Sequence, residues 1–69
     1  MSVAKVSEII ASSEKSFEDA ITRGIARADK TLDNVKGAWI SEQKVMVEKG
    51  KVVEYPVTMR VTFVLKEQG

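Results

Sequence analysis

Few residues in this chain are able to carry out chemistry. Its 69 residues include no histidine and no cysteine, which removes the commonest general base, the thiolate nucleophile and the commonest transition-metal ligands. Ser12, Ser13 and Ser16 lie directly before a helical pattern, where capping of the helix explains them better than nucleophilic catalysis. Asp29 and Asp33 lie one helical turn apart, but basic neighbours make them an ordinary solvated surface rather than a cation site. We therefore expect a protein that is not an enzyme, with no catalytic residue and no metal site.

Trp39 is the residue with the clearest potential to bind a ligand. It is the only tryptophan of the chain, and it follows Gly37 and Ala38 at the start of a predicted strand. An accessible indole ring offers a stacking surface to a planar ligand. The alternative is that Trp39 packs between subunits, where aromatic residues are enriched. The sequence leaves both interpretations open.

The helix that precedes Trp39 has the strongest pattern in the sequence. Apolar residues recur at spacings of three and four, which predicts an amphipathic helix; they are Phe17, Ile21, Ile25, Ala28, Leu32 and Val35. Ser13 or Ser16 is expected to cap its N-terminus, and Asn34 and Gly37 are expected to end it with a left-handed turn. The helix should therefore have roughly 20 residues and a length of about 30 Å.

Three strands are predicted in addition to this helix. β-Branched residues favour a strand over Met1–Ile10, and a hairpin joins Ala38–Glu48 to Lys51–Lys66 through a turn at Lys49-Gly50. In the last segment apolar residues occupy the odd positions, which predicts one strand face on a core; they are Val53, Tyr55, Val57, Met59, Val61, Phe63 and Leu65. The predicted fold is α+β, with the order β-α-β-β, a three-stranded antiparallel sheet and one long helix packed on one face. Residues 1–69 are expected to form a single domain.

Size and charge point to self-association. A chain of 69 residues is near the lower limit for folding alone, and one helix covers only one face of the sheet. The other face would carry Thr58, Arg60 and Thr62, so we expect further copies to cover it, with Arg60 buried against Glu42 or Glu54.

A net charge of +1 gives no nucleic-acid footprint. No apolar run of roughly 20 residues and no signal-peptide pattern occurs, which favours a cytoplasmic protein with no membrane partner.

The order of elements, the length and several local motifs together resemble the dodecins, small flavoproteins built as hollow homododecamers. The resemblance covers nearly the whole chain. It rests on Lys5-Val6-Ser7-Glu8-Ile9, Ser12-Ser13-Glu14-Lys15-Ser16-Phe17, Ala26-Arg27-Ala28-Asp29-Lys30-Thr31-Leu32-Asp33-Asn34-Val35, Glu54-Tyr55 and Val61-Thr62-Phe63-Val64-Leu65. It implies a non-enzymatic homododecamer that binds or stores a flavin, either FMN or riboflavin.

Both residues that the resemblance assigns to the flavin depart from the family pattern. In flavin-binding dodecins a Trp after the helix stacks on the isoalloxazine ring, and a Gln directly after the Tyr of the last strand hydrogen-bonds the polar edge of the ring. A gap-free match places Gly37 and Pro56 at these positions, and proline lacks even a backbone N–H. Trp39 lies two residues beyond Gly37, on the same strand face. We therefore expect a weak or absent flavin, with Trp39, Gly37 and Pro56 as the altered site; the alternative is a structural or cation-binding dodecin-like assembly without flavin.

Overall fold

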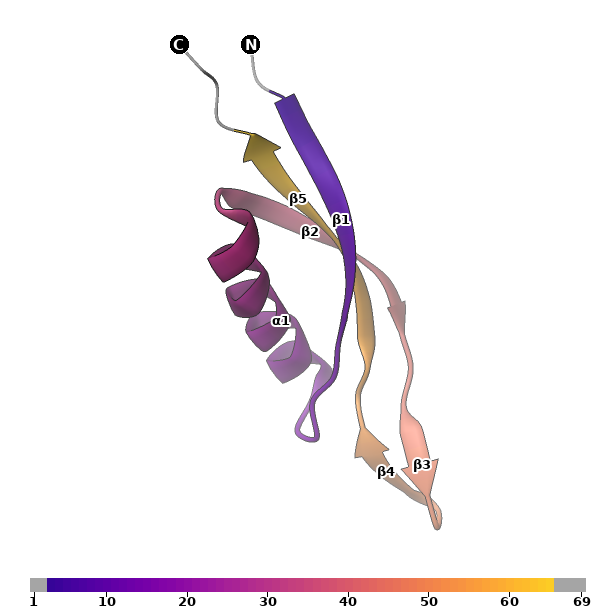
Figure 1. The fold of residues 1–69 in the computed structure, drawn as a ribbon. Coiled ribbons are helices and arrows are strands. Elements are labelled where there is room, and N and C mark those ends of the chain that lie inside the picture. The colour runs from indigo at the N-terminus through magenta and orange to yellow at the C-terminus, as the bar shows by residue number, and fades with distance from the viewer. Residues whose placement is uncertain (1–2, 66–69) are drawn as a thin grey trace.

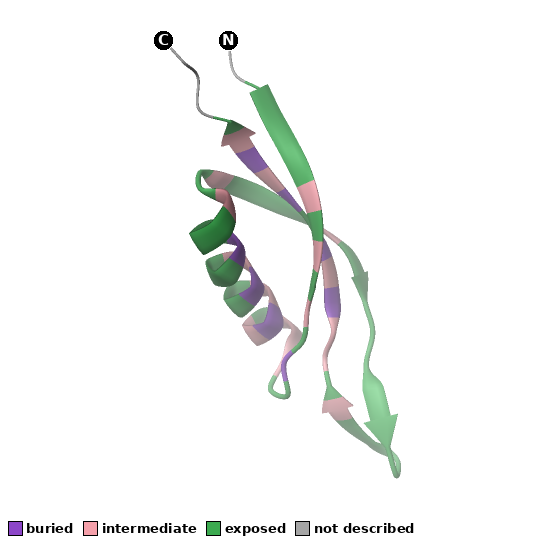
Figure 2. Cartoon of the chain, viewed as in Figure 1, coloured by how far each residue is buried: buried purple, intermediate pink, exposed green. Residues whose placement is uncertain are grey.

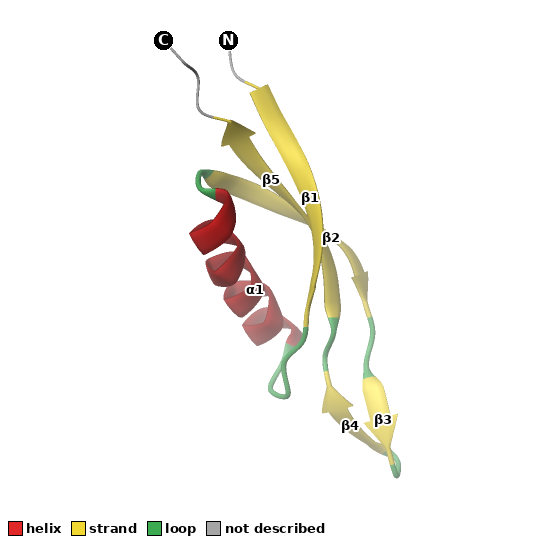
Figure 3. Ribbon diagram, viewed as in Figure 1, coloured by secondary structure: helices red, strands yellow, loops and turns green. Residues whose placement is uncertain are grey.

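The computed structural model describes residues 3–65, and its elements follow the predicted order with the hairpin divided into more strands (Figures 1 and 3). The elements, in chain order, are β1 (Val3–Ala11), α1 (Phe17–Leu32), β2 (Val35–Gln43), β3 (Met46–Glu48), β4 (Lys51–Glu54) and β5 (Val57–Leu65). The predicted limits of the first and last strands, Met1 and Lys66, lie outside the described residues.

The main sheet has three antiparallel strands with β5 in the centre. β1 pairs along one edge of β5 and β2 along the other, and α1 lies across one face of this sheet (Figure 1). The alternation predicted for the last strand is confirmed over its main part, since Val57, Met59, Val61 and Phe63 are buried. The predicted α+β architecture, one helix on a three-stranded antiparallel sheet, is therefore confirmed.

The helix approaches the sheet through a line of small residues. Ala20, Gly24 and Ala28 are the buried positions of α1, whereas the large residues of the predicted stripe pack only partly buried beside the core: Phe17, Ile21, Ile25 and Leu32. At Gly24 an added Cβ atom would lie 2.6 Å from Cε of Met59 and 2.9 Å from Cβ of Ala11. The missing side chain lets the helix come close enough to bury Met59 completely.

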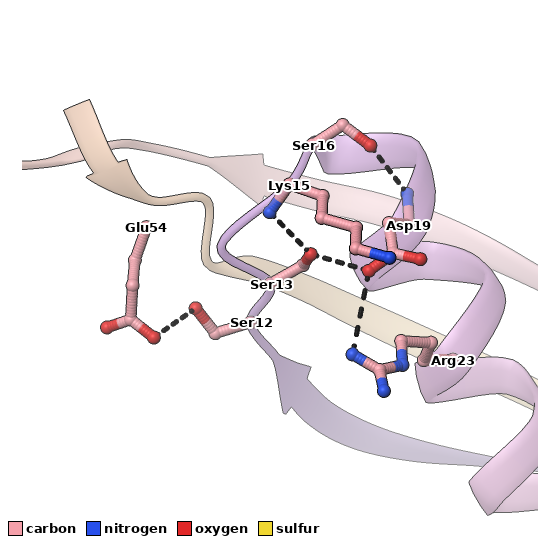
Figure 4. Close-up of polar contacts among 7 residues, drawn as sticks. All are labelled: Ser12, Ser13, Lys15, Ser16, Asp19, Arg23 and Glu54. Atoms are coloured by element: carbon pink, nitrogen blue, oxygen red, sulfur yellow. Dashed lines mark hydrogen bonds and ion pairs between the residues drawn. The ribbon is translucent and has the colours of Figure 1, made fainter.

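The helix begins at Phe17 behind a small network of serine hydroxyls (Figure 4). The backbone N–H of Asp19 donates to Oγ of Ser16 at 3.0 Å, which confirms Ser16 as the cap. Ser13 is buried beside it; its Oγ accepts from the N–H of Lys15 at 2.9 Å and donates to the Asp19 carboxylate at 2.6 Å. Local structure thus accounts for both hydroxyls, in agreement with the capping role predicted for this cluster.

The helix is shorter than predicted, with 16 residues instead of roughly 20. Asp33 and Asn34 adopt left-handed φ angles of 56° and 53°, a conformation in which a helix ends. The stop at Asn34 is confirmed, but Gly37 takes no part in it and lies within β2. The second strand consequently starts at Val35, three residues before the predicted Ala38.

β3 and β4 form a separate hairpin, residues 46–54, which extends beyond the helix and the main sheet (Figure 1) and which we call the hairpin arm. The two long predicted strands are therefore wrong in one respect, because each is interrupted, at residues 44–45 and 55–56. The predicted turn is confirmed: Lys49 and Gly50 have φ angles of 52° and 77°, as a two-residue type I′ turn requires. Most of the hairpin arm is exposed (Figure 2).

Candidate ligand site on the outer sheet face

The face of the main sheet opposite α1, which we call the outer sheet face, is uncovered over residues 3–65 (Figure 1). Side chains alternate between the two faces of a strand, and residues opposite each other on antiparallel strands share a face. The register therefore builds this face from three rows across the sheet. Its middle row is Glu8, Arg60 and Trp39, flanked by Val6, Thr62 and Gly37 on one side and by Ile10, Thr58 and Glu42 on the other.

Trp39 lies in the middle of this face and is 62% exposed. The side chain of Arg60, directly opposite on β5, lies over the indole with its guanidinium carbon 5.1 Å from the ring centroid. This is a cation–π contact, which contributes about 0.5–1 kcal/mol at an exposed site. One face of the ring is thus in contact with a cation, and much of the remaining ring surface is accessible.

Arg60 has a different acidic neighbour from those predicted. Its Nε lies 3.7 Å from Oε2 of Glu8, which is opposite on β1, and both side chains are more than half exposed. Within the chain Glu42 is opposite Thr58, and Glu54 lies in the hairpin arm. The burial of Arg60 against Glu42 or Glu54 at a contact between copies stays a prediction. An exposed ion pair of this kind contributes about 0–1 kcal/mol.

Gly37 lies beside Trp39 on the outer sheet face, opposite Thr62. A Cβ atom added at Gly37 would have no heavy atom within 4 Å, and its φ lies outside the left-handed region. The position is therefore open and free of backbone strain. A Cβ atom can therefore be added here without contact with its neighbours.

Pro56 lies far from the other two predicted site residues. Its carbonyl accepts a hydrogen bond from the N–H of Lys44 at 3.3 Å, which places it level with a residue five positions beyond Trp39. Along β5, which lacks the extra residue of β2, Pro56 is four residues from Arg60, the residue opposite Trp39. At 3.3 Å per residue this separation is about 13 Å. The structure thus brings Gly37 and Trp39 together on β2, but it does not bring Pro56 to them within one chain.

A groove of about 530 Å³ lies between β1 and α1, away from Trp39. Its walls are mostly apolar, including Ile9, Ile10 and Leu32, and Arg23 and Arg27 also line it.

No group of three Asp, Glu, His or Cys side chains suited to a metal ion occurs among residues 3–65. The helix of residues 3–65 has too few residues and too many charges to span a bilayer.

The contact between Arg60 and Trp39 is not among the sequence predictions, although the strand register that follows from the turn indicates it. Pairing residues outward from Lys49-Gly50 places Trp39 opposite Arg60. The ladder departs from this count between Met46 and Val47, and again between Ile40 and Glu42. Each of these register shifts comes from one extra, unpaired residue, on β4 in the first case and on β2 in the second. The two shifts therefore cancel before the pairing reaches Trp39. No such count reaches Glu8, because a helix separates β1 from its partner β5.

The fold and sequence match known proteins along nearly the whole chain. A family model described as Dodecin matches residues 3–66. The calcium dodecin of Mycobacterium tuberculosis is 32% identical over 66 residues, which are 96% of this chain and 93% of that protein. The dodecin of Thermus thermophilus is 35% identical over 65 residues, 94% of each chain.

A solved structure gives the same result. The dodecin from Streptomyces davaonensis superposes with a TM-score of 0.91 at 32% identity, covering 96% of this chain and 97% of that one. The β-α-β-β order, the sheet with β5 in its centre and the single helix are thus shared features. The chain belongs to the dodecin family.

Proposed function

We propose that the chain is the subunit of a homo-oligomeric shell that holds a small planar ligand between copies and does not transform it. The observation that carries this proposal is Trp39, which is 62% exposed on a sheet face that the chain leaves uncovered. A large apolar ring gains free energy when a ligand or another copy covers it. The family resemblance supplies the expectation of twelve subunits and of a flavin.

The shape of the single chain supports self-association. Its Cα radius of gyration is 14.3 Å, whereas a compact domain of this length has about 11 Å. It exposes 5355 Å², whereas a compact monomer of this mass exposes about 4,300 Å². Part of the excess is apolar and lies on the outer sheet face and the hairpin arm, including Val6, Ile10, Val47 and Val52. Contact between copies would cover these side chains.

The hairpin arm offers a direct test of assembly. Val47 and Val52 are paired across it and both are exposed, so Val47→Asp should leave the fold of the chain intact. If the hairpin arm packs against another copy, the substitution buries a charge at that contact, which is costly. We expect sedimentation velocity at micromolar concentration to show the unaltered chain as a large oligomer and Val47→Asp as smaller species. Thr22→Asp, which adds the same charge on the exposed side of α1, is the control; equal masses for all three chains would contradict the role given to the hairpin arm.

A flavin fits part of this site. Trp39 offers a ring for stacking, and the open space at Gly37 leaves room beside it. The polar edge of a flavin lacks its family partner, because Pro56 has neither a side-chain donor nor an N–H. FMN or riboflavin, when bound, would supply the planar ring, and the chain would hold it mainly through Trp39. We therefore propose weak flavin binding.

The position of Pro56 bears on where such a ligand lies. With about 13 Å between it and Trp39 along the sheet, one chain cannot place both against a single flavin ring. The two residues can share a ligand only if they come from different copies. The proposed ligand site is therefore an interface site, and it should be lost when the oligomer dissociates.

The proposed function is tested on the purified oligomer in two steps. Native mass spectrometry should give a complex of many copies, with twelve as the family expectation. Addition of riboflavin or FMN to that complex should quench the fluorescence of both the flavin and Trp39. A monomer at micromolar concentration, or an oligomer without any flavin effect on Trp39, would contradict the proposal.

Cation binding is the second candidate, favoured by the similarity to the calcium dodecin of Mycobacterium tuberculosis. The carboxylates of residues 3–65 do not gather into a group of three within one chain, and Ca²⁺ takes six to eight oxygen ligands. A calcium site would therefore need carboxylates from several copies. If this function is correct, the melting temperature of the oligomer should rise with Ca²⁺ and fall with a chelator, without a comparable effect of Mg²⁺.

A further inference from the structure

We propose that Arg60 makes the Trp39 site selective for planar ligands that carry a negative charge. This inference rests on the proposed function, in which Trp39 holds a planar ligand. It adds the chemical class of the ligand, and it assigns a specificity-determining role to a residue outside the positions that the family resemblance identified.

The guanidinium of Arg60 lies against the indole of Trp39. Arg60 is directly opposite Trp39 in the ladder, and its guanidinium carbon lies 5.1 Å from the centre of the indole. A planar ligand on Trp39 must therefore use the other face of the ring or displace the guanidinium from the near face. In both cases the ligand lies within a few ångströms of a permanent positive charge.

The N–H donors of the Arg60 guanidinium are available to an anionic ligand. A guanidinium has five N–H donors in a planar fork, and among residues 3–65 the nearest carboxylate oxygen is that of Glu8, 3.7 Å from Nε. This distance is too long for a hydrogen bond, and an exposed pair of this kind is readily exchanged for another partner. The fork can therefore turn to a phosphate or carboxylate and bind two of its oxygens at once.

Few charged side chains surround Arg60 and Trp39 on the outer sheet face. The row with Val6, Thr62 and Gly37, which lies next to Arg60 and Trp39, carries no charge. Glu8 in the middle row and Glu42 in the other flanking row are the acidic groups of these three rows. Glu8 competes with an anionic ligand for Arg60, so its removal should strengthen anion binding. A cationic planar ligand would meet the guanidinium directly and be disfavoured.

The test uses two ligands with the same ring and different charge, FMN with its phosphate and neutral riboflavin. Binding is followed by quenching of flavin fluorescence on the assembled protein. We expect FMN to bind about tenfold more tightly than riboflavin, which is the lower end for a charge-assisted contact because the site is exposed. This preference should shrink in 0.5 M NaCl, and Glu8→Gln should enlarge it.

Variants of Arg60 separate charge from geometry. Arg60→Gln should abolish the preference for FMN, so that the two ligands bind with equal affinity. Arg60→Lys should keep part of the preference, because the charge remains and the fork is lost. Lys36→Gln removes a charge from β2, four residues past the end of α1, and serves as the control. If Arg60→Gln fails to assemble, the salt dependence of the unaltered protein and Arg60→Lys still decide the question.

The outcomes distinguish this inference from the proposed function. Equal affinity for FMN and riboflavin, unchanged by salt, would overturn the role of Arg60 and leave Trp39 as a stacking residue. Binding of neither ligand would overturn both. A preference for FMN that survives in Arg60→Gln would assign the phosphate contact to another residue and would also overturn the inference.

Discussion

The double variant Gly37→Trp with Pro56→Gln should bind riboflavin ten- to a hundredfold more tightly than the unaltered chain. Stacking of a base on an aromatic side chain contributes about 1–3 kcal/mol, and about 1.4 kcal/mol corresponds to a factor of ten in affinity. Gly37 accepts the new side chain, because its Cβ position is open and its backbone has no positive φ. Pro56→Gln keeps the carbonyl that binds Lys44 and adds both an N–H and an amide.

The single variants show how the gain is divided. Gly37→Trp alone should supply most of it, and Pro56→Ala, which removes the ring without adding an amide, should supply none. Binding is measured by flavin fluorescence, since the variant has two tryptophans. The same variant with Trp39→Ala shows whether the natural indole obstructs the restored ring. No gain in either background would mean that these two positions are not a degraded flavin site.

Gly24→Leu should cost about 3 kcal/mol of folding free energy or more, the upper end for adding atoms to a packed core. Even a single Cβ would lie 2.6 Å from Met59 and 2.9 Å from Ala11, and the longer side chain would force α1 off the sheet. A domain of this size has only about 3–5 kcal/mol from its core. We expect the subunit of this variant to be largely unfolded and therefore unable to assemble.

Gly37→Leu is the matched control, with the same change at a glycine that has open space around it. Its free energy of unfolding should differ from that of the unaltered chain by less than about 0.5 kcal/mol. Urea unfolding followed by circular dichroism compares the two. Equal midpoints for Gly24→Leu and Gly37→Leu would show that the close approach of α1 at Gly24 does not limit the packing.

The sequence predicts those parts of the fold that depend on patterns among residues close together in the chain. The alternation along β5 fixes which of its residues enter the core, and the Lys49-Gly50 turn sets the pairing of the strands on either side of it. The apolar spacing likewise locates α1. It does not reveal that Ala20, Gly24 and Ala28 form the line of closest approach, because small residues give a weak hydrophobic signal.

The candidate site is less predictable, because it depends on contacts that no local pattern sets. Glu8 reaches Arg60 only through the pairing of β1 with β5, which a helix separates in the chain. The distance between Pro56 and Trp39 depends on the register of β2 with β5, whereas matching residue by residue to a family treats them as one site. Trp39 itself was predictable as the candidate, since it is the only tryptophan of the chain.

Ligand binding at Trp39 is tested most directly by titrating the assembled protein with riboflavin and FMN and following the fluorescence of Trp39. Because this is the only tryptophan, its emission reports on this site alone. We expect saturable quenching with a dissociation constant on the order of micromolar, together with quenching of the flavin, and loss of flavin quenching in Trp39→Ala. Unchanged Trp39 emission at saturating flavin, or equal flavin binding by Trp39→Ala, would contradict it.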